Sequence, residues 1–394
     1  MRQPQGSSPP GGGGPREAWW RGSAPPPKDP ISQAFRLPAP PGEEHPQSVS
    51  RRLVLASGLA LAACGREPAQ AQPVPDTPLK SLAPFRVGCC VQASQTTDPA
   101  FTDLLTRHFS QITPEWEMKM EYIVQPDGSF RFDRPDAIAA FARSRGLRLF
   151  GHTLVWYANE PEGFVKLDES RQSFEGAYSN YVTAVVSRYR GLAVGWDVVN
   201  EPIRDDGTGP RDSLWSRKLG QIGHFKVAFD AARAADPDAI LFTNDYHLES
   251  KPQKLASYMR LIEQLLQAGV PLGGIGCQTH CDSGLAPGAI GRTLKTLAGF
   301  GLPIHLSEMD VSVTGGGPLA SRVDAEQRQA RLYGEAMAAY AALPERQQFA
   351  FSVWGLRDKD SWIRREVPSD APLLFNDAGQ PKPAFGAVVE ALRR

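Results

Sequence analysis

The chain has 394 residues, 41% of them hydrophobic, and its 43 Lys and Arg balance 43 Asp and Glu, so the formal net charge at pH 7 is zero. This length and composition suffice for one large barrel domain or two smaller domains. The balanced charge supplies no basic excess for nucleic acid or an anionic membrane surface, so we expect no nucleic-acid partner.

The first 48 residues predict a disordered extension. They are rich in Pro, Gly and Ser, with runs such as Gly11–Gly14, and show no apolar periodicity. Such a segment cannot bury enough apolar surface to offset the entropy lost on ordering. A mis-assigned start codon, with translation beginning near Val49, is the alternative explanation.

Residues 49–64 are typical of an export signal. A basic pair precedes the apolar run Leu53–Ala63, which is too short to span a bilayer. The end of this run, Leu61–Cys64, resembles a bacterial lipoprotein box, and Ser50–Leu55 resembles a twin-arginine signal. We therefore expect an exported protein, either periplasmic, secreted or held at the outer membrane by a lipid anchor at Cys64.

A Pro- and Ala-rich linker over residues 65–84 leads into a regular pattern that we assign to one domain, 85–394. Strand-like apolar runs lie at about 85–92, 109–114, 147–156, 194–201, 239–246, 273–280, 302–311 and 348–356. Segments with helical spacing include Arg134–Arg145, Arg171–Tyr189, Ser216–Ala235, Gln253–Ala268, Ile290–Phe300, Ala325–Ala342 and Ala384–Leu392. Eight strands alternating with helices over roughly 300 residues predict an α/β fold of the (β/α)8 TIM barrel type. A doubly wound open sheet is the competitor, and the absence of a Gly-x-Gly-x-x-Gly turn after the first strand disfavours it.

Polar side chains end most of these strands, and a barrel would bring them together at one mouth. They comprise Glu115, Lys119, His152, Trp156, Asn200, Glu201, Asn244, Asp245, Tyr246, Gln278, His280, Glu308, Asp310 and Trp354. Amides and carboxylates bind hydroxyl groups and indole rings stack on sugars, so the set suits a neutral polyhydroxylated ligand. Two glutamates there, Glu201 and Glu308, indicate glycoside hydrolysis, with retention or inversion decided by the distance between their carboxyl groups.

Several neighbouring residues have structural interpretations. Asp197, inside a strand, is expected to be a structural carboxylate with a local partner. Asp245 and Asp310 either orient other side chains or cap loops, and His305 is expected to be a core or supporting histidine.

The cysteines give no strong metal signal. Cys277 and Cys281 flank Gln-Thr-His, but no pair of Cys-x-x-Cys units is present, so a structural zinc site is not expected. We interpret both as small apolar residues near a strand end rather than as metal ligands or a disulfide.

The motifs resemble glycoside hydrolase family 10, the retaining endo-1,4-β-xylanases, over about residues 84–394. The matching segments are Gly151–Trp156, Trp196–Pro202, Asn244–Tyr246, Gly276–His280, Ile304–Asp310, Trp354–Gly355 with Asp358, Ser361 and Trp362, Pro372–Phe375, and Lys382–Phe385. The resemblance implies hydrolysis of internal β-1,4-xylosidic bonds of xylan by double displacement, with Glu201 as acid/base and Glu308 as nucleophile. It implies neither a metal nor an organic cofactor, and we expect a monomer.

The resemblance also implies a set of substrate-binding residues. These are Glu115, Lys119, His152, Trp156, Asn159, Asn200, Gln278, His280, Trp354 and Trp362. Within the set, Asn200 would bind the 2-hydroxyl of the sugar at the cleavage point, and His280 would hydrogen-bond the nucleophile.

The chain departs from the family pattern on the side that binds non-reducing sugars. The usual Glu-Asn-x-Met-Lys-Trp reads Glu115–Met120, with Trp116 for the amide and Met120 for the tryptophan, and the usual His-x-Gln reads Tyr157–Asn159. The usual Pro-x-Trp also becomes Pro-Glu-Gly-Phe164. We expect Trp116 to add stacking and remove a polar contact, which loosens selectivity for sugar hydroxyls.

These departures favour one alternative function. A second alternative function belongs to a different class of protein. The first is a related retaining β-glycanase or aryl β-glycosidase acting on short xylo- or cello-oligosaccharides. The second is a catalytically inactive carbohydrate-binding barrel, which has no need for the two glutamates, Glu201 and Glu308.

Overall fold

The strands of the protein, seen in a computed structural model that describes residues 77–166, 170–315 and 321–394, close into a parallel barrel. The barrel strands are β1 (Arg86–Val91), β2 (Gln111–Pro114), β3 (Arg148–Gly151), β5 (Ala193–Asn200), β6 (Ile240–Asp245), β7 (Gly274–Cys277), β9 (Ile304–Ser312) and β10 (Gln348–Val353). They pair in that order, and β10 is hydrogen-bonded in parallel to both β9 and β1. An open sheet would leave two unpaired edges, so the competitor is excluded and the predicted (β/α)8 barrel is confirmed.

Two short strands extend the barrel at its carboxyl-terminal edge. Strand β4 (Val155–Trp156) pairs with the end of β5, and β8 (His280–Asp282) pairs with the end of β9. Both strands carry residues that the sequence assigned to the binding set, Trp156 and His280. The extension therefore fixes these two side chains at the mouth.

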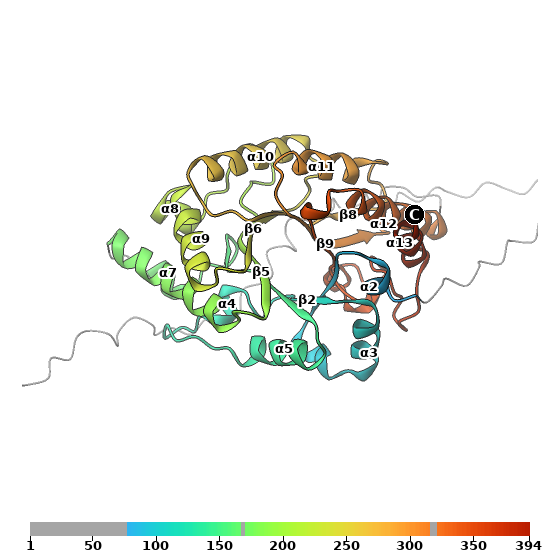
Figure 1. Ribbon diagram of the computed structural model, residues 1–394, viewed down its shortest axis with the longest axis horizontal. Helices are drawn as coiled ribbons and strands as arrows, with labels where there is room; N and C mark the ends of the chain where they lie inside the picture. Colours follow the sequence, from blue (N-terminus) through green and yellow to red (C-terminus); the bar gives the residue numbers. More distant parts are fainter. Residues whose placement is uncertain (1–76, 167–169, 316–320) are drawn as a thin grey trace, which may run out of the picture.

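Helices surround the barrel in chain order (Figure 1). They are α2 (Leu79–Leu82), α3 (Pro99–His108), α4 (Met120–Ile123), α5 (Asp133–Ser144), α6 (Glu162–Lys166), α7 (Arg171–Arg188), α8 (Leu214–Leu219), α9 (Gly223–Ala235), α10 (Pro252–Gln267), α11 (Ala289–Ala298), α12 (Arg322–Ala341) and α13 (Pro383–Arg393). Short 3₁₀ helices are η1 (Ala93–Thr97), η2 (Glu345–Gln347), η3 (Asp358–Asp360) and η4 (Trp362–Arg365). In the part of the chain described, no helix is both long and apolar enough to cross a bilayer.

The helices differ from the sequence prediction in several places. The segment predicted as one helix, Ser216–Ala235, is two helices, because Gly220 adopts φ 88° and ends α8. Helix α3 was not predicted; the Asp98 carboxylate caps it by accepting from the backbone N–H groups of Ala100 and Phe101. Helix α2 lies in the stretch assigned to the linker, and its Leu79 is fully buried against the barrel core.

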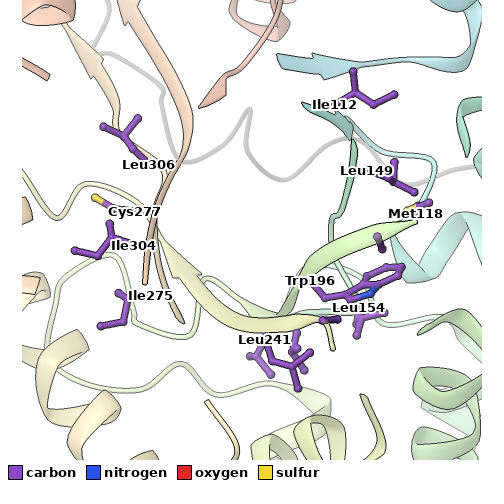
Figure 2. Packing of buried hydrophobic residues seen from close by; sticks show 14 of the residues in the cluster. Ile112, Met118, Leu149, Leu154, Trp196, Leu241, Ile275, Cys277, Ile304 and Leu306 are labelled. Carbon is purple, nitrogen blue, oxygen red and sulfur yellow. The ribbon is translucent and has the colours of Figure 1, made fainter. Parts of the chain in front are cut away.

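The main apolar core lies between the strands and the surrounding helices. Figure 2 shows part of it, with Ile112, Leu149, Trp196 and Leu241 coming from successive barrel strands. Burying each side chain of this size stabilises the fold by about 1.5–3 kcal/mol.

A smaller cluster of Phe150, Phe242, Phe349 and Ala350 comes from three different strands, β3, β6 and β10. His305 packs edge-on against Phe150, 4.4 Å between ring centroids, and its Nε2 lies 2.8 Å from the Ser352 hydroxyl. His305 is thus a core histidine, as its apolar neighbours in the sequence indicated.

The predicted extension 1–48 and export signal 49–64 lie outside the described residues, as does most of the linker.

Candidate active site

Two glutamates lie buried at the carboxyl-terminal mouth of the barrel, each about 3% exposed. Glu201 immediately follows β5, and Glu308 lies within β9. The chain turns sharply at Glu201, which adopts φ 56° and donates its backbone N–H to the Asn244 carbonyl at 2.7 Å. A left-handed conformation is uncommon for a non-glycine residue and marks a position that the surrounding structure enforces.

Side-chain donors hold both oxygens of the Glu201 carboxyl. Nε1 of Trp156 donates to Oε2 at 2.7 Å, and Nε2 of Gln278 donates to Oε1 at 3.1 Å. Burial raises the pKa of Glu201 above its usual value, and the negative charges of Asp245 and Glu308 add to this, against the two hydrogen bonds. Glu201 therefore favours its protonated form more than a free glutamate does.

The Glu308 carboxyl has the opposite electrostatic setting. Nδ2 of Asn244 donates to Oε1 at 2.7 Å, and Nε2 of His280 lies 3.4 Å from Oε2. Burial alone raises the pKa of Glu308, but His152, His280 and Lys119 together outweigh burial and lower it below its usual value. Glu308 therefore favours its ionised form.

A chain of polar contacts from His280 through Asp310 to Trp362 supports Glu308. Nδ1 of His280 lies 2.9 Å from Oδ1 of Asp310, close enough for an ion pair but not aligned as a hydrogen bond. Nε1 of Trp362 donates to the other Asp310 oxygen at 2.9 Å. Burial lowers the pKa of His280, but the carboxylates of Asp310 and Glu308 outweigh burial and raise this pKa to about 10. His280 is thus a cation at neutral pH, and Asp310 acts by orienting it, which decides between the two interpretations of Asp310.

Side-chain amides connect the two glutamates. Nδ2 of Asn200 donates to Glu201 at 3.2 Å, while its Oδ1 accepts from Nδ2 of Asn244 at 3.0 Å. The same Asn244 nitrogen reaches Glu308, and Ser307 donates to the Asn244 oxygen at 2.9 Å. The amides hold the two carboxyl groups in one fixed network.

Two further buried acids, Asp197 and Asp245, have structural partners. Oδ2 of Asp197 lies 2.8 Å from Nδ1 of His152, which follows the neighbouring strand β3, and burial raises the pKa of Asp197 to about 6. Asp245 accepts from the backbone N–H groups of Ile203 and Tyr246, each at 2.9 Å, and lies 2.8 Å from Nζ of Lys254. Asp245 therefore caps the loop that follows Glu201, one of the two roles the sequence left open.

Two tryptophans flank the mouth beside the histidines. The Trp354 ring lies 5.1 Å from His152, and the Trp362 ring lies 5.5 Å from His280, both edge-on. Cys90 packs against both tryptophans. A cavity of about 370 Å³ opens beside His280, Asp310 and Trp362.

The predicted binding residues that follow β2 and β3 have different contacts. Nζ of Lys119 sits 4.6 Å above the Trp156 ring, a cation–π contact. Glu115 is bound by Gln92 at 2.6 Å and by Arg365 at 2.7 Å. Asn159 is 1% exposed, and its side-chain amide has no hydrogen-bond partner among the described residues.

Trp116, which stands where the family pattern has an amide, packs against other side chains of its own neighbourhood. Its ring lies 4.6 Å from Tyr122 and 5.0 Å from the Arg134 guanidinium. The indole is thus part of an aromatic and cationic surface beside Glu115 and Lys119.

One group of side chains has the composition of a metal site. Among the described residues, ligand atoms of His152, Asp197 and Glu308 lie within 4.8 Å of one another. The contacts above already engage all three, through the His152–Asp197 pair and the Asn244–Glu308 bond. The four cysteines in the described part of the chain are unpaired, consistent with the apolar interpretation of Cys277 and Cys281.

Two contacts were not predicted from the sequence. Asn244 was noted at a strand end, but its bridge between the glutamates depends on β6 lying between β5 and β7. The contact of Arg365 with Glu115 joins residues 250 positions apart and has no local sequence signal.

In chemical terms, the site holds one carboxyl group, Glu201, that favours its protonated form and one, Glu308, that favours its ionised form.

Comparison with known proteins identifies related sequences and structures. The family described as glycosyl hydrolase family 10 matches residues 79–391. Endo-1,4-beta-xylanase A of Cellvibrio japonicus is 33% identical over 346 residues, which cover 80% of this chain and 56% of the relative. Endo-1,4-beta-xylanase A of a Caldicellulosiruptor species is 35% identical, covering 81% of this chain and 48% of the relative. The chain thus spans about half the length of these two relatives.

A solved structure shows the same architecture. A variant of xylanase 10C from Cellvibrio japonicus, in complex with xylopentaose, superposes with a TM-score of 0.76 at 28% identity. The superposition covers 82% of this chain and 70% of that structure.

Proposed function

The chain belongs to glycosyl hydrolase family 10, and from this premise we propose that it is a retaining endo-1,4-β-xylanase that cleaves internal β-1,4-xylosidic bonds of xylan. The observation that carries the proposal is the pair of buried glutamates with opposite pKa shifts, raised for Glu201 and lowered for Glu308. A pair of acids set apart in this way has one member ready to donate a proton and one ready to attack.

In the first step, the ionised Glu308 attacks the anomeric carbon of the sugar at the cleavage point. The bond between that carbon and the glycosidic oxygen breaks, and Glu201 gives its proton to the departing oxygen. The result is a sugar joined to Glu308 by an ester bond, while Glu201 is left as a carboxylate.

In the second step, the Glu201 carboxylate accepts a proton from water, and the water oxygen attacks the anomeric carbon. The ester bond to Glu308 breaks, and both glutamates return to their starting protonation states. Two successive inversions at one carbon give a product with retained β-configuration.

The neighbouring side chains support these steps. The cationic His280 stabilises the charge of Glu308 before attack and after release, at 3.4 Å. Asn200 lies between the two glutamates, where it can bind the 2-hydroxyl of the reacting sugar. Trp354 and Trp362 flank His152 and His280 and offer apolar ring surface to that sugar.

The substrate-binding set extends from this centre toward the non-reducing side. In this proposal Glu115, Lys119, Trp156 and Asn159 line the sites for the sugars before the cleavage point. Gln278 acts through its hydrogen bond to Glu201.

A second candidate is a related retaining β-glycanase or aryl β-glycosidase acting on short xylo- or cello-oligosaccharides. The aromatic and cationic surface of Trp116, Tyr122 and Arg134 favours it, because an indole stacks on a sugar ring without selecting particular hydroxyl groups. Comparable rates on aryl xyloside and aryl cellobioside would support this candidate, and a Trp116→Asn variant with unchanged selectivity would remove it.

The cellular location follows from the sequence alone. The basic pair and the apolar run Leu53–Ala63, followed by Cys64, support export and a lipid anchor. Labelling cells with a radioactive fatty acid tests the anchor, because a Cys64→Ser variant would lose the label. Sedimentation of the released protein tests whether it is a monomer.

Product analysis tests the reaction. The enzyme is incubated in parallel with xylan, xylo-oligosaccharides and cello-oligosaccharides, and the fresh products are followed by NMR and mass spectrometry. Short xylo-oligosaccharides that form first as the β-anomer support the proposal. Cleavage confined to cello-oligosaccharides transfers it to the second candidate, and a Glu308→Ala variant as active as wild type contradicts the mechanism.

A further inference from the structure

Arg365, in the loop after β10, holds Glu115, which follows β2, on one side of the barrel mouth. Its Nη2 lies 2.7 Å from Oε1 of Glu115. The other Glu115 oxygen accepts from Nε2 of Gln92 at 2.6 Å. The carboxylate is thus fixed from two sides, by the residue that follows β1 and by η4, which follows β10.

The two partners differ in their exposure to water. The Glu115 side chain is 8% exposed, whereas that of Arg365 is 52% exposed. A pair with one partner withdrawn from water is less screened than a fully exposed pair, so it constrains geometry more strongly. Because Arg365 itself is half exposed, replacing it leaves the apolar core unchanged.

The helix η4 connects this contact to the support of Glu308. In a 3₁₀ helix, residues three positions apart lie on the same face. At one end of η4, Trp362 donates to Asp310, which pairs with His280; three residues later, Arg365 binds Glu115. The same short helix therefore positions Asp310, in β9, and Glu115, which follows β2.

Glu115 differs from the other polar residues on its side in the groups that it contacts. Trp156 donates directly to Glu201, and Lys119 lowers the pKa of Glu308 through its charge. The hydrogen bonds of Glu115 go to Gln92 and Arg365 instead. In the proposed function this places Glu115 at the sugar that precedes the reacting one.

We infer that Arg365 is a positioning residue that orients Glu115 and thereby sets how strongly the enzyme selects substrates with a second sugar on the non-reducing side. The inference rests on the proposed function. A carboxylate pinned at both oxygens presents its remaining lone pairs in fixed directions, so the hydroxyl groups of that sugar meet a prepared acceptor.

Two substrates that differ by one sugar isolate this effect. An aryl β-xyloside and an aryl β-xylobioside with the same phenol share the reacting sugar and leaving group, and only the second places a sugar next to Glu115. We expect the ratio of kcat/KM values, xylobioside over xyloside, to fall by about tenfold in Arg365→Met, the size expected for one misplaced charge-assisted hydrogen bond. The change should appear mainly in KM for the xylobioside.

Two further variants make the test specific. Arg364→Met removes the adjacent arginine, which binds Asp377 at 2.6 Å and the Pro368 carbonyl, and it should keep the wild-type ratio. Arg365→Lys keeps the charge but loses the planar guanidinium geometry, so it should restore part of the ratio. If Arg365→Met does not fold, the ratio of kcat/KM values measured for Arg365→Lys still tests the inference.

The outcomes separate the inference from the function on which it rests. A ratio that stays at the wild-type value in both Arg365 variants, or an equal loss on both substrates, overturns the positioning role. A wild-type enzyme that cleaves neither xyloside contradicts the proposed function, and with it the inference.

Discussion

Replacing Trp156 by Phe removes one hydrogen bond to the proposed acid/base residue and keeps an aromatic ring in place. Nε1 of Trp156 lies 2.7 Å from Oε2 of Glu201, and both residues are at most 3% exposed. The change removes neither of the other donors to this carboxyl, Nε2 of Gln278 at 3.1 Å and Nδ2 of Asn200 at 3.2 Å. The variant therefore alters the protonation equilibrium of one group.

The size of the effect follows from the energy of that bond. A hydrogen bond to a charged group contributes about 1.5–3 kcal/mol. Since one pKa unit corresponds to about 1.36 kcal/mol, losing the bond raises the pKa of Glu201 by about one to two units. The protonated carboxyl also loses part of the bond, so we expect a rise near the lower value. Burial already raises this pKa, and the variant moves it further in the same direction.

The pH dependence of kcat/KM reports this shift. Glu201 must carry its proton to assist departure of the glycosidic oxygen, so its pKa sets the basic limb. Glu308 must be ionised to attack, and its lowered pKa sets the acid limb. In Trp156→Phe the basic limb should move to higher pH by about one unit while the acid limb stays in place.

Hydrolysis of xylotetraose suits the measurement, because its sugar leaving group needs protonation. Trp215→Phe is the matched control, since its indole donates to the Trp156 main-chain carbonyl at 3.3 Å and makes no bond to Glu201. A basic limb that stays in place or moves to lower pH would refute the reasoning, as would a parallel shift of both limbs.

Four further predictions test other parts of the structure. His280→Gln removes a cation from beside the proposed nucleophile, so the acid limb of kcat/KM should move to higher pH by about one unit, and an unmoved limb would contradict the stabilising role. Gly276→Ala places a Cβ 2.4 Å from Oδ1 of Asn244 and should lower kcat about tenfold by displacing the bridging amide, a loss of about 1.4 kcal/mol in transition-state stabilisation. Gly176→Ala in α7, where a Cβ meets no atom within 4 Å, should keep the activity and add about 0.5–1 kcal/mol of stability in urea unfolding. Burial lowers the pKa of His224 to about 3, so its contribution to stability is present above the unfolded pKa of about 6.5 and is lost as the pH falls toward 3. The melting temperature of His224→Phe should therefore fall less steeply than wild type on acidification, and identical slopes would contradict this assignment.

The sequence by itself predicted the kind of fold, which the closed barrel confirms, and singled out the candidate chemistry-bearing residues. Strand-like apolar runs such as 194–201 and 302–311 have a local pattern, because both faces of a parallel strand are buried. Glu201 and Glu308 could be singled out because each ends or interrupts such a run with a carboxylate. The end of a helix was harder to predict. Gly220 divides one predicted helix into two, but only its φ of 88°, which the sequence does not show, distinguishes it from a glycine tolerated inside a helix.

Only the tertiary structure decided how these residues work together. Closure of β10 on β1, which also pairs with β2, brings the loops after β10 and β2 to the same side of the mouth, and so places Arg365 against Glu115. Packing of β6 between β5 and β7 makes Asn244 the bridge between the two glutamates. The pKa values of Glu201 and Glu308 move in opposite directions because their surroundings come from different strands. Burial and charge depend on neighbours that are distant in the chain, so two identical side chains acquire different roles only in the folded protein.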